Sequence, residues 1–337
     1  MPVERILVVG PAWVGDMVMA QSLFKTLKQH KPELSIDVLA PAWSKPLLER
    51  MPEVNNAIIL PLGHGQLGLK TRYRLGQQLR KPAYQQAILL PNSWKSALVP
   101  FWAGIPRRTG FLGELRWGLV NDVRPLDKAR LPMTVQRFVA LGLERDALLP
   151  PPVPAPALQV KAAEVAGALR RHGLARPTVP VLGLCPGAEY GPAKRWPAEY
   201  FAEIARHYLK SGWAVWLFGS EKDILPGREI AAQAGEGCLD LTGKTSLADA
   251  VDLLSLTTVV LSNDSGLMHV AAALDRRLVA IYGSSAPGFT PPLNPRAKIL
   301  SLGLVCSPCF QRECPLGHLQ CLRDLSPAQV LAAIAQT

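Results

Sequence analysis

Residues 5–17 read Arg5-Ile6-Leu7-Val8-Val9-Gly10-Pro11-Ala12-Trp13-Val14-Gly15-Asp16-Met17. Within the first five, Ile6–Val9 form an apolar, partly β-branched run, which is typical of a strand buried in a parallel sheet and predicts a strand over Arg5–Val9. The run stops at Gly10-Pro11, and an amphipathic pattern with Leu23, Phe24 and Leu27 on one face predicts a helix over Met17–Gln29. A strand, a glycine-containing loop and a helix in this order begin a βαβ unit.

The same alternation continues to the end of the chain. Further apolar runs predict strands at Ser35–Leu39, Ala57–Leu60, Gln86–Leu90, Val179–Leu184, Ala214–Phe218, Thr258–Leu261 and Leu278–Tyr282. Helical patterns lie at Gln66–Arg80, Pro197–Lys210, Ser246–Ser255, Ser265–Leu274 and Ser326–Gln336. The sequence therefore predicts an α/β protein with doubly wound, Rossmann-like parallel sheets.

A proline-rich segment interrupts this alternation once, at residues 150–156. Proline fixes φ and removes a backbone donor, so the segment cannot continue a helix or a central strand. We expect a first domain over residues 1–155, a second over 156–325 and a closing helix over 326–337, with the two domains facing each other across a cleft. Ligands in such sheets bind beyond the carboxyl ends of the strands.

Composition restricts the class of protein and its partners. The chain has 337 residues, 48% of them hydrophobic, and 37 Lys+Arg against 26 Asp+Glu give a net charge of +11. These values exclude a disordered chain and a collagen-like repeat. The positive charge admits nucleic acid, an anionic membrane surface or a phosphorylated substrate. No apolar run approaches about 18 residues and no signal peptide is recognisable, so we expect a cytoplasmic protein.

The loop after the first strand, residues 10–17, has the glycine spacing of a P-loop but not its chemistry. A P-loop places Lys and Ser/Thr after the second glycine, whereas this chain has Asp16 and Met17 there. A carboxylate would repel a nucleotide phosphate at this point. Asp16 could cap the helix, which is the commoner role, or accept a proton from an incoming hydroxyl group.

A second loop, residues 186–197, follows the first strand of the second domain. Its glycines allow the backbone to approach a ligand closely, and Lys194 and Arg195 carry positive charge just before a helix N-terminus. A third loop, residues 262–269, also joins a strand to a helix. Ser265 and Gly266 would offer backbone N–H groups to a pyrophosphate, and Asp264 would accept hydrogen bonds from sugar hydroxyls.

Two common motifs are missing. The chain has no Asp-x-Asp pair, the usual carboxylate handle for a metal-bound sugar nucleotide, and no G-x-G-x-x-G fingerprint of a dehydrogenase. Charge neutralisation on a leaving phosphate would then come from Lys194 and a helix N-terminus.

Together, the three loops resemble those of the heptosyltransferases of lipopolysaccharide core biosynthesis, glycosyltransferase family 9. The resemblance covers nearly the whole chain. It includes Leu90-Pro91-Asn92-Ser93-Trp94-Lys95-Ser96-Ala97-Leu98, Gly104-Ile105-Pro106-Arg107-Arg108-Thr109-Gly110 and Phe289-Thr290-Pro291-Pro292. It implies the GT-B fold and an inverting, metal-independent transfer of L-glycero-D-manno-heptose from ADP-heptose. The implied acceptor is the first heptose of the inner core, on heptosyl-Kdo2-lipid A. The alternative is a related GT-B transferase that uses another nucleotide sugar or core acceptor, of heptosyltransferase type I or III.

The resemblance also implies roles for single residues. Asp16 matches the family's catalytic base, which replaces the cap reading, and Lys194 matches the lysine that binds the donor phosphates. The implied donor-binding residues are Gly187, Ala188, Glu189, Lys194, Glu221, Thr245, Asp264, Ser265, Gly266 and His269.

The acceptor is a multiply negative, lipid-anchored sugar, so basic residues of the first domain are its candidate contacts. We expect the acceptor-binding set to be Trp13, Lys95, Arg107, Arg108 and Arg116, with the basic residues in loops or helix starts. The charge of +11 then predicts peripheral, salt-sensitive attachment to the inner face of the cytoplasmic membrane.

Four cysteines lie close together late in the chain: Cys306, Cys309, Cys314 and Cys321. Their spacing suits structural zinc, although it matches no standard zinc module closely, and free thiols or a disulfide are an equally good reading. No cofactor is expected to be required for catalysis.

A nucleic-acid-binding protein and a non-catalytic sugar-nucleotide regulator are the competing functions. The first lacks a recognisable basic, aromatic-interleaved module, and the second is opposed by Asp16.

Overall fold

The computed structural model describes residues 3–63 and 65–337, and it divides the chain into two compact units, one up to Pro156 and one from Ala157. The expected first domain began at residue 1, and its first two residues lie outside the described part. The boundary falls one residue beyond the expected one.

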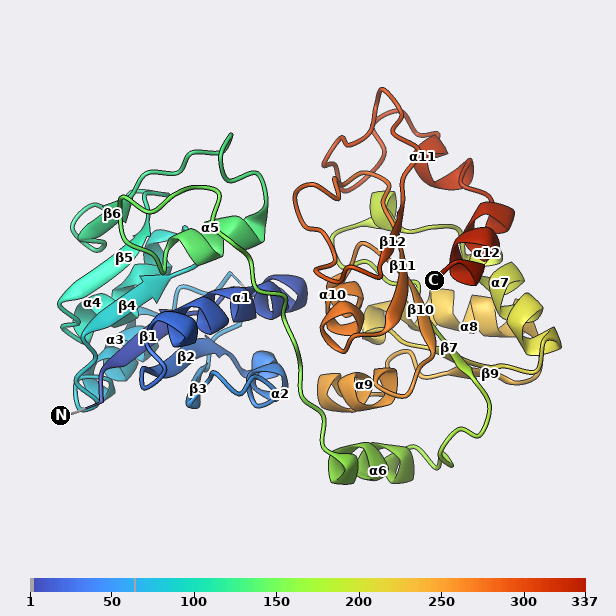
Figure 1. The fold of residues 1–337 in the computed structure, drawn as a ribbon, viewed down its shortest axis with the longest axis horizontal. Coiled ribbons are helices and arrows are strands. Elements are labelled where there is room, and N and C mark those ends of the chain that lie inside the picture. The colour runs from blue at the N-terminus through green and yellow to red at the C-terminus, as the bar shows by residue number, and fades with distance from the viewer. Residues whose placement is uncertain (1–2, 64) are drawn as a thin grey trace. The chain divides into compact units, whose positions relative to one another are not determined.

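The first unit contains a six-stranded parallel sheet with the strand order β3-β2-β1-β4-β5-β6 (Figure 1). Its elements are β1 (Arg5–Val9), α1 (Val14–His30), β2 (Ser35–Pro41), η1 (Ala42–Ser44), α2 (Lys45–Leu48), β3 (Asn56–Leu60), α3 (Leu69–Gln78), β4 (Gln86–Leu89), η2 (Trp94–Ala97), α4 (Leu98–Trp102), β5 (Arg107–Phe111), β6 (Asp122–Arg124) and α5 (Thr134–Ala140).

The second unit repeats this design, with the strand order β12-β11-β10-β7-β8-β9. Its elements are α6 (Ala162–Arg171), β7 (Val181–Cys185), η3 (Pro192–Lys194), α7 (Ala198–Lys210), β8 (Ala214–Leu217), η4 (Glu221–Asp223), α8 (Ile224–Ala234), β9 (Cys238–Asp240), α9 (Leu247–Leu254), β10 (Val259–Asn263), α10 (Gly266–Ala273), β11 (Arg277–Ile281), β12 (Lys298–Leu300), α11 (Gln320–Arg323) and α12 (Pro327–Ala335).

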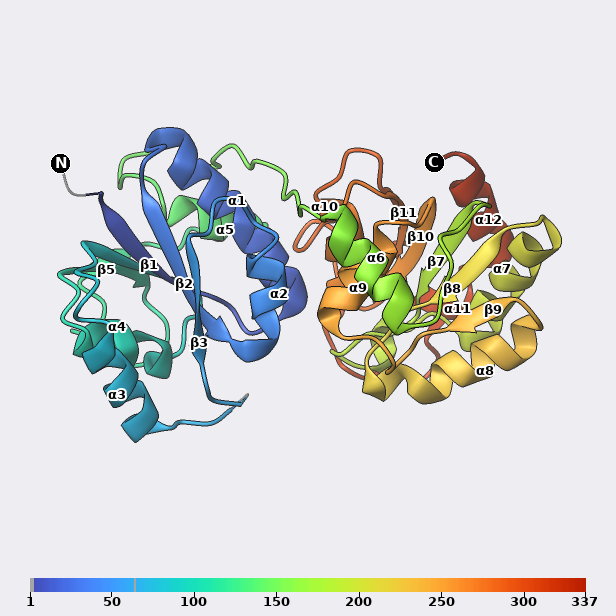
Figure 2. The same cartoon turned by 90° about the horizontal axis from the view of Figure 1, so that it is seen from below.

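Alternation of side chains along the strands explains why helices cover both faces of each sheet, as Figure 2 shows for each unit. Leu7 and Val9 of β1 belong to a core cluster that includes Val99 of α4. Ile6 and Val8 point to the opposite face and are also buried. Strands buried on both faces read as continuous apolar runs, which is why the sequence located β1 at its observed bounds.

The proline-rich segment is fastened to the first unit. The Ser22 hydroxyl donates to the Pro154 carbonyl at 2.7 Å, and Lys25 Nζ donates to the Ala155 carbonyl at 2.8 Å. Both donors lie on α1. At the other end of the chain, α12 packs into the core of the second unit through Val330 and Ile334, so it completes that unit's helical layer.

Each sheet reverses its strand order at one point: between β1 and β4 in the first unit, and between β7 and β10 in the second. Such a switch point opens a crevice at the carboxyl ends of the strands, where α/β proteins bind ligands. Two Rossmann-like units in one chain are the composition of the GT-B fold, and the expected fold class is confirmed.

Several outer elements differ from the sequence-based prediction. The strands β5, β6, β9 and β12 were not predicted, because they are short, or polar, or both. β5 reads Arg-Arg-Thr-Gly-Phe, so its first three positions carry no apolar side chain.

None of the helices in the described ranges combines the length and apolar character needed to cross a membrane.

Candidate active site

The two loops that flank the switch point of the second unit are joined by an ion pair. Lys194, in η3 after β7, places its Nζ 2.5 Å from Oδ2 of Asp264, which follows β10. The Asp264 side chain is buried, and the Ser285 hydroxyl donates to the same carboxylate oxygen at 2.5 Å. The structure thus brings together two of the predicted site residues, and it adds Ser285 from the loop after β11.

Asn263 holds the same two loops in place, although it is not one of the predicted site residues. Its Oδ1 accepts from the Trp196 backbone N–H at 3.1 Å, and its Nδ2 donates to the Pro186 carbonyl at 2.6 Å. Asn263 is fully buried, so both bonds lie away from water, where losing one leaves a costly unpaired group. The only signal in the sequence was its position, one residue before Asp264.

Gly187 lies where no larger residue fits. A Cβ placed on it would lie 2.5 Å from the Asp223 carboxylate. Asp223 cannot move away easily, because its Oδ2 accepts from both the backbone N–H and the hydroxyl of Ser220, at 2.9 and 2.8 Å. Glycine is therefore required for the backbone of this loop to pass so close to the strand end. The neighbouring Ala188 is buried, whereas Glu189 is exposed and pairs with Lys222.

The third predicted loop forms the start of α10. Ser265 is its N-cap residue and Gly266 its first residue, so the backbone N–H groups expected for anion binding lie at this helix N-terminus. Two further predicted residues lie on the outer side of the same sheet edge: Glu221 is exposed and follows β8, and Thr245 is half-buried and follows β9.

His269 of α10 is buried beside this site. Burial lowers the pKa of its imidazole to about 4, an effect that Asp264 opposes and Lys194 reinforces. The ring is therefore neutral at physiological pH, which suits a hydrogen-bonding role rather than that of a cation.

We expect this pKa to appear in the pH dependence of folding. Between about pH 6.5 and 4 the unfolded chain binds a proton that the folded chain does not bind, so stability falls as the pH falls. By this linkage, wild type should lose roughly 2–3 kcal/mol more than His269→Gln between about pH 7.5 and 4.5, measured by urea unfolding. His207→Gln, on the exposed face of α7, is the control and should follow wild type. An identical pH dependence for His269→Gln and wild type would contradict the burial argument.

In the first unit, three predicted residues lie at the carboxyl edge beside the switch point. Asp16 is the third residue of α1, after β1, and Trp13 is the N-cap residue of that helix. Trp13 is exposed, and Lys95 lies in η2 after β4. The interpretation of Asp16 as the helix N-cap is therefore wrong, because Trp13 occupies that position.

Arg116 was expected to contact the acceptor, and the structure contradicts this. Its side chain is completely buried. Its guanidinium donates to the Pro91 carbonyl at 2.7 Å and to the Phe111 carbonyl, and it also contacts Ser96 and Asn92. Burial lowers the pKa of this guanidinium, although it remains charged. Arg116 therefore supports the loop that carries Lys95 and has no surface left for a ligand.

Arg107 and Arg108 were expected in a loop near the acceptor, and this placement is also wrong. Both belong to β5, and Arg107 pairs in register with Gln86, the first residue of β4. They lie at the amino edge of the parallel sheet, roughly 13 Å from its carboxyl edge for a five-residue strand. The Arg108 guanidinium donates to the carbonyls of Leu119 and Ile105 at 2.7 and 2.6 Å.

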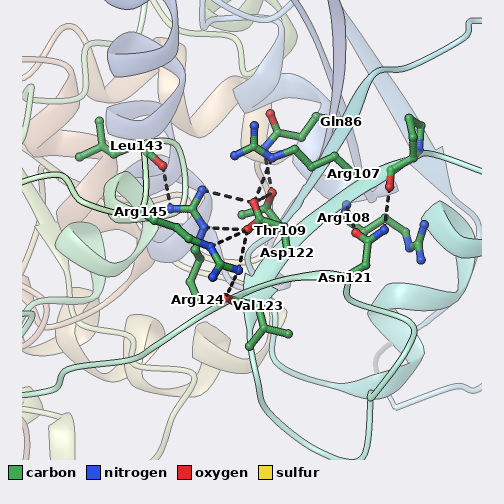
Figure 3. A network of polar contacts seen from close by, with 11 residues as sticks. Gln86, Arg107, Arg108, Thr109, Asn121, Asp122, Val123, Arg124, Leu143 and Arg145 are labelled. Carbon is green, nitrogen blue, oxygen red and sulfur yellow. Dashed lines mark hydrogen bonds and ion pairs between the residues drawn. The ribbon is translucent and has the colours of Figure 1, made fainter.

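Figure 3 shows what Arg107 does instead. It joins Arg124 and Arg145 around the carboxylate of Asp122, at 3.0, 3.2 and 3.3 Å, and Thr109 donates to the same group at 2.8 Å. Burial alone would raise the pKa of Asp122. The hydrogen bonds and positive charges of these partners outweigh that effect and hold the pKa well below its ordinary value. The cluster links β5 to β6, the last strand at this edge of the sheet.

Mutation of Arg116 should therefore destabilise the protein much more than mutation of Arg107. Arg116→Ala removes the partner of several buried carbonyls and should lower the free energy of unfolding by about 3 kcal/mol or more. Arg107→Ala should cost no more than about 1 kcal/mol, because Arg107 is half-exposed and Asp122 keeps Arg124. Urea unfolding of both variants measures this, and equal losses would contradict the assignment.

The four late cysteines all carry free thiols and line one small cavity with His318. The expectation of a disulfide is contradicted, and that of zinc stays a prediction.

Comparison with known proteins identifies the family. The sequence model described as "Glycosyltransferase family 9 (heptosyltransferase)" matches residues 72–320. The chain belongs to this family. It is 48% identical to lipopolysaccharide heptosyltransferase 2 of Escherichia coli K12, covering 97% of this chain and 96% of the relative. It is 50% identical to lipooligosaccharide heptosyltransferase 2 of Haemophilus influenzae, covering 88% of each.

A solved structure agrees with these relatives. The structure of E. coli ADP-heptose LPS heptosyltransferase II superposes with a TM-score of 0.86 at 46% identity, and covers 98% of this chain and 99% of that one. This glycosyltransferase therefore transfers heptose in lipopolysaccharide core biosynthesis. The competing functions, nucleic-acid binding and non-catalytic regulation, are not supported.

Proposed function

We propose that this heptosyltransferase moves L-glycero-D-manno-heptose from ADP-heptose to the first heptose of heptosyl-Kdo2-lipid A, with inversion at the anomeric carbon. One observation carries the proposal: the likeness to E. coli ADP-heptose LPS heptosyltransferase II extends over 98% of the chain at 46% identity. Relatives named heptosyltransferase 2 at 48 and 50% identity support the choice of a heptose-bearing acceptor over types I and III.

In this proposal, Asp16 is the general base. It lies beyond the carboxyl end of β1, at the switch point where α/β sheets bind ligands. The acceptor hydroxyl loses its proton to the Asp16 carboxylate as its oxygen bonds to the anomeric carbon. The bond from that carbon to the phosphate oxygen breaks on the opposite face, and ADP leaves with the electron pair. Attack opposite the leaving group inverts the anomeric centre.

Lys194 and the N-terminus of α10 are proposed to stabilise the departing diphosphate. Lys194 supplies a full positive charge, and the N–H groups after Ser265 supply fixed dipoles in the same loop cluster. Because the Lys194 ammonium contacts Asp264 in the free protein, a bound diphosphate would share or displace that contact. No Asp-x-Asp pair is present to hold a metal on the diphosphate, and Lys194 with the helix end is proposed to replace it.

The remaining donor contacts follow the second sheet's carboxyl edge. Asp264 is proposed to accept hydrogen bonds from the heptose hydroxyls, because its carboxylate is held rigidly by Lys194 and Ser285. The loop around Gly187, with Ala188 and Glu189, is proposed to pass along the diphosphate. Glu221, Thr245, Ser265, Gly266 and His269 complete the proposed donor-binding set.

For the acceptor, Trp13 and Lys95 remain the proposed contacts of the predicted set. The exposed indole offers an apolar face to a sugar ring, and the ammonium group offers a charge to its phosphates. A net charge of +11 supports peripheral binding on the inner face of the cytoplasmic membrane. Such binding to vesicles containing anionic lipid would weaken as ionic strength rises.

The donor assignment is tested by titrating the enzyme with ADP-heptose, ADP, and a uridine and a guanosine diphosphate sugar in a calorimeter. We expect ADP-heptose and ADP to bind at least about tenfold more tightly than the other two, which is about 1.4 kcal/mol of discrimination. Equal or tighter binding of a uridine or guanosine nucleotide would contradict the donor assignment.

A further inference from the structure

The segment 306–321, called here the cysteine loop, runs from the loop after β12 into the first turn of α11 in the second unit (Figure 1). Cys306, Cys309, Cys314 and Cys321 line a single cavity of about 20 Å3. A volume of this size exceeds the minimum for one water molecule, so it can hold one metal ion. All four thiols are free.

The backbone turns tightly after Cys314, whose carbonyl accepts a hydrogen bond from the Gly317 N–H at 3.0 Å. Leu319 adopts a left-handed backbone conformation with φ 53°, unusual for a leucine, so this turn is held by its surroundings.

Ser284 provides an independent indication of a ligand. Its side chain is buried at 1% exposure and lines the same cavity. Within the described residues its Oγ has no hydrogen-bond partner. A buried hydroxyl without a partner is costly, and a metal-bound thiolate would accept its hydrogen bond.

We propose that the cysteine loop binds one Zn2+ ion through the sulfur atoms of Cys306, Cys309, Cys314 and Cys321. Four soft thiolate ligands favour zinc in tetrahedral geometry. No three His, Cys, Asp or Glu side chains among the described residues are already arranged to hold a metal. The ion therefore assembles the site: the thiols turn inward about their single χ1 bonds and release the protons they still carry to solvent.

The position of the cysteine loop gives the zinc a consequence for the donor site. The Arg312 carbonyl accepts from the Ala193 N–H at 3.0 Å, and the Phe310 carbonyl accepts from the Tyr190 hydroxyl at 2.7 Å. Gly191 passes so near Arg312 that a Cβ would lie 2.4 Å from its carbonyl oxygen. The loop thus supports residues 190–193, directly before Lys194. A bound zinc ion holds the cysteine loop, and therefore its contacts with residues 190–193, in place. The zinc site itself does not depend on which nucleotide sugar the enzyme uses as donor.

The test measures metal content in the full-length enzyme, purified without chelators and then reconstituted with Zn2+ in the absence of oxygen. We expect about one zinc per chain in wild type, loss of most of it in Cys314→Ser, and full retention in Cys238→Ser. Cys238 is the matched control, because it is a free, partly buried cysteine of β9 and does not line the cavity.

A second measurement on the wild type avoids any folding defect of the variant. In the native protein, the four cysteines of the cysteine loop should react slowly with a thiol reagent. A chelator should release zinc, and the number of these thiols that become reactive should rise in proportion to the zinc released. Substoichiometric zinc after reconstitution, stoichiometric iron in its place, or zinc retained in Cys314→Ser would each overturn the proposal. So would four thiols that react equally fast with and without the chelator.

Discussion

Asp16→Asn should lower kcat by about a thousandfold or more while the affinity for ADP stays within about twofold of wild type. Asparagine has the size and shape of aspartate but cannot accept the acceptor's proton, so the chemical step loses its base. The residue lies in the first unit, after β1, whereas the proposed nucleotide contacts all lie in the second. Donor binding should therefore survive. Steady-state ADP release and calorimetric titration with ADP measure the two quantities.

The control for this variant is Asp146→Asn, an exposed carboxylate elsewhere in the same unit. It should leave both kcat and ADP affinity unchanged. If Asp16→Asn kept more than about a tenth of wild-type turnover, or if it lost ADP binding in parallel with turnover, Asp16 would not be the base.

Lys194→Met should raise the donor KM and lower kcat, with kcat/KM falling by about two to three orders of magnitude. The variant removes a full positive charge from the proposed diphosphate site but keeps the length of the side chain. It also removes one of the two side chains that contact the buried Asp264 carboxylate among the described residues. The Ser285 hydroxyl, which is uncharged, remains. A fall in stability should therefore accompany the loss of activity.

Two controls separate these effects. Lys194→Arg retains the charge, so it should recover stability in unfolding measurements and part of the ADP affinity. Lys222→Met removes a nearby exposed lysine that pairs with Glu189, and it should have little effect on kcat/KM. A Lys194→Met enzyme within about threefold of wild type in both kcat and KM would contradict the proposed role.

The central strands and their loops could be predicted from the sequence because each carries a strong local signal. Strands such as β1 and β10 each contain a continuous, buried apolar stretch, Ile6–Val9 and Val259–Leu261, and glycine or short polar residues follow it. That local signal was enough to place Asp16, Lys194 and Asp264 at the carboxyl edges of their own sheets.

The misplaced arginines show where such reasoning fails. Arg116 is buried because the Pro91 carbonyl and the Ser96 hydroxyl, 25 and 20 positions earlier in the chain, accept its hydrogen bonds, and the sequence around Arg116 does not indicate this. Arg107 and Arg108 open an outer strand whose polar sequence reads as a loop, so the sheet edge on which they lie was assigned wrongly. Asn263 and Ser285 were missed because their role consists only of long-range hydrogen bonds.

The central claim is that this enzyme adds heptose to an acceptor that already carries one. The most direct measurement is mass spectrometry of the products formed from ADP-heptose with two defined acceptors, Kdo2-lipid A and heptosyl-Kdo2-lipid A. The account predicts one added heptose on heptosyl-Kdo2-lipid A and none on Kdo2-lipid A. Heptose added to Kdo2-lipid A alone would contradict it.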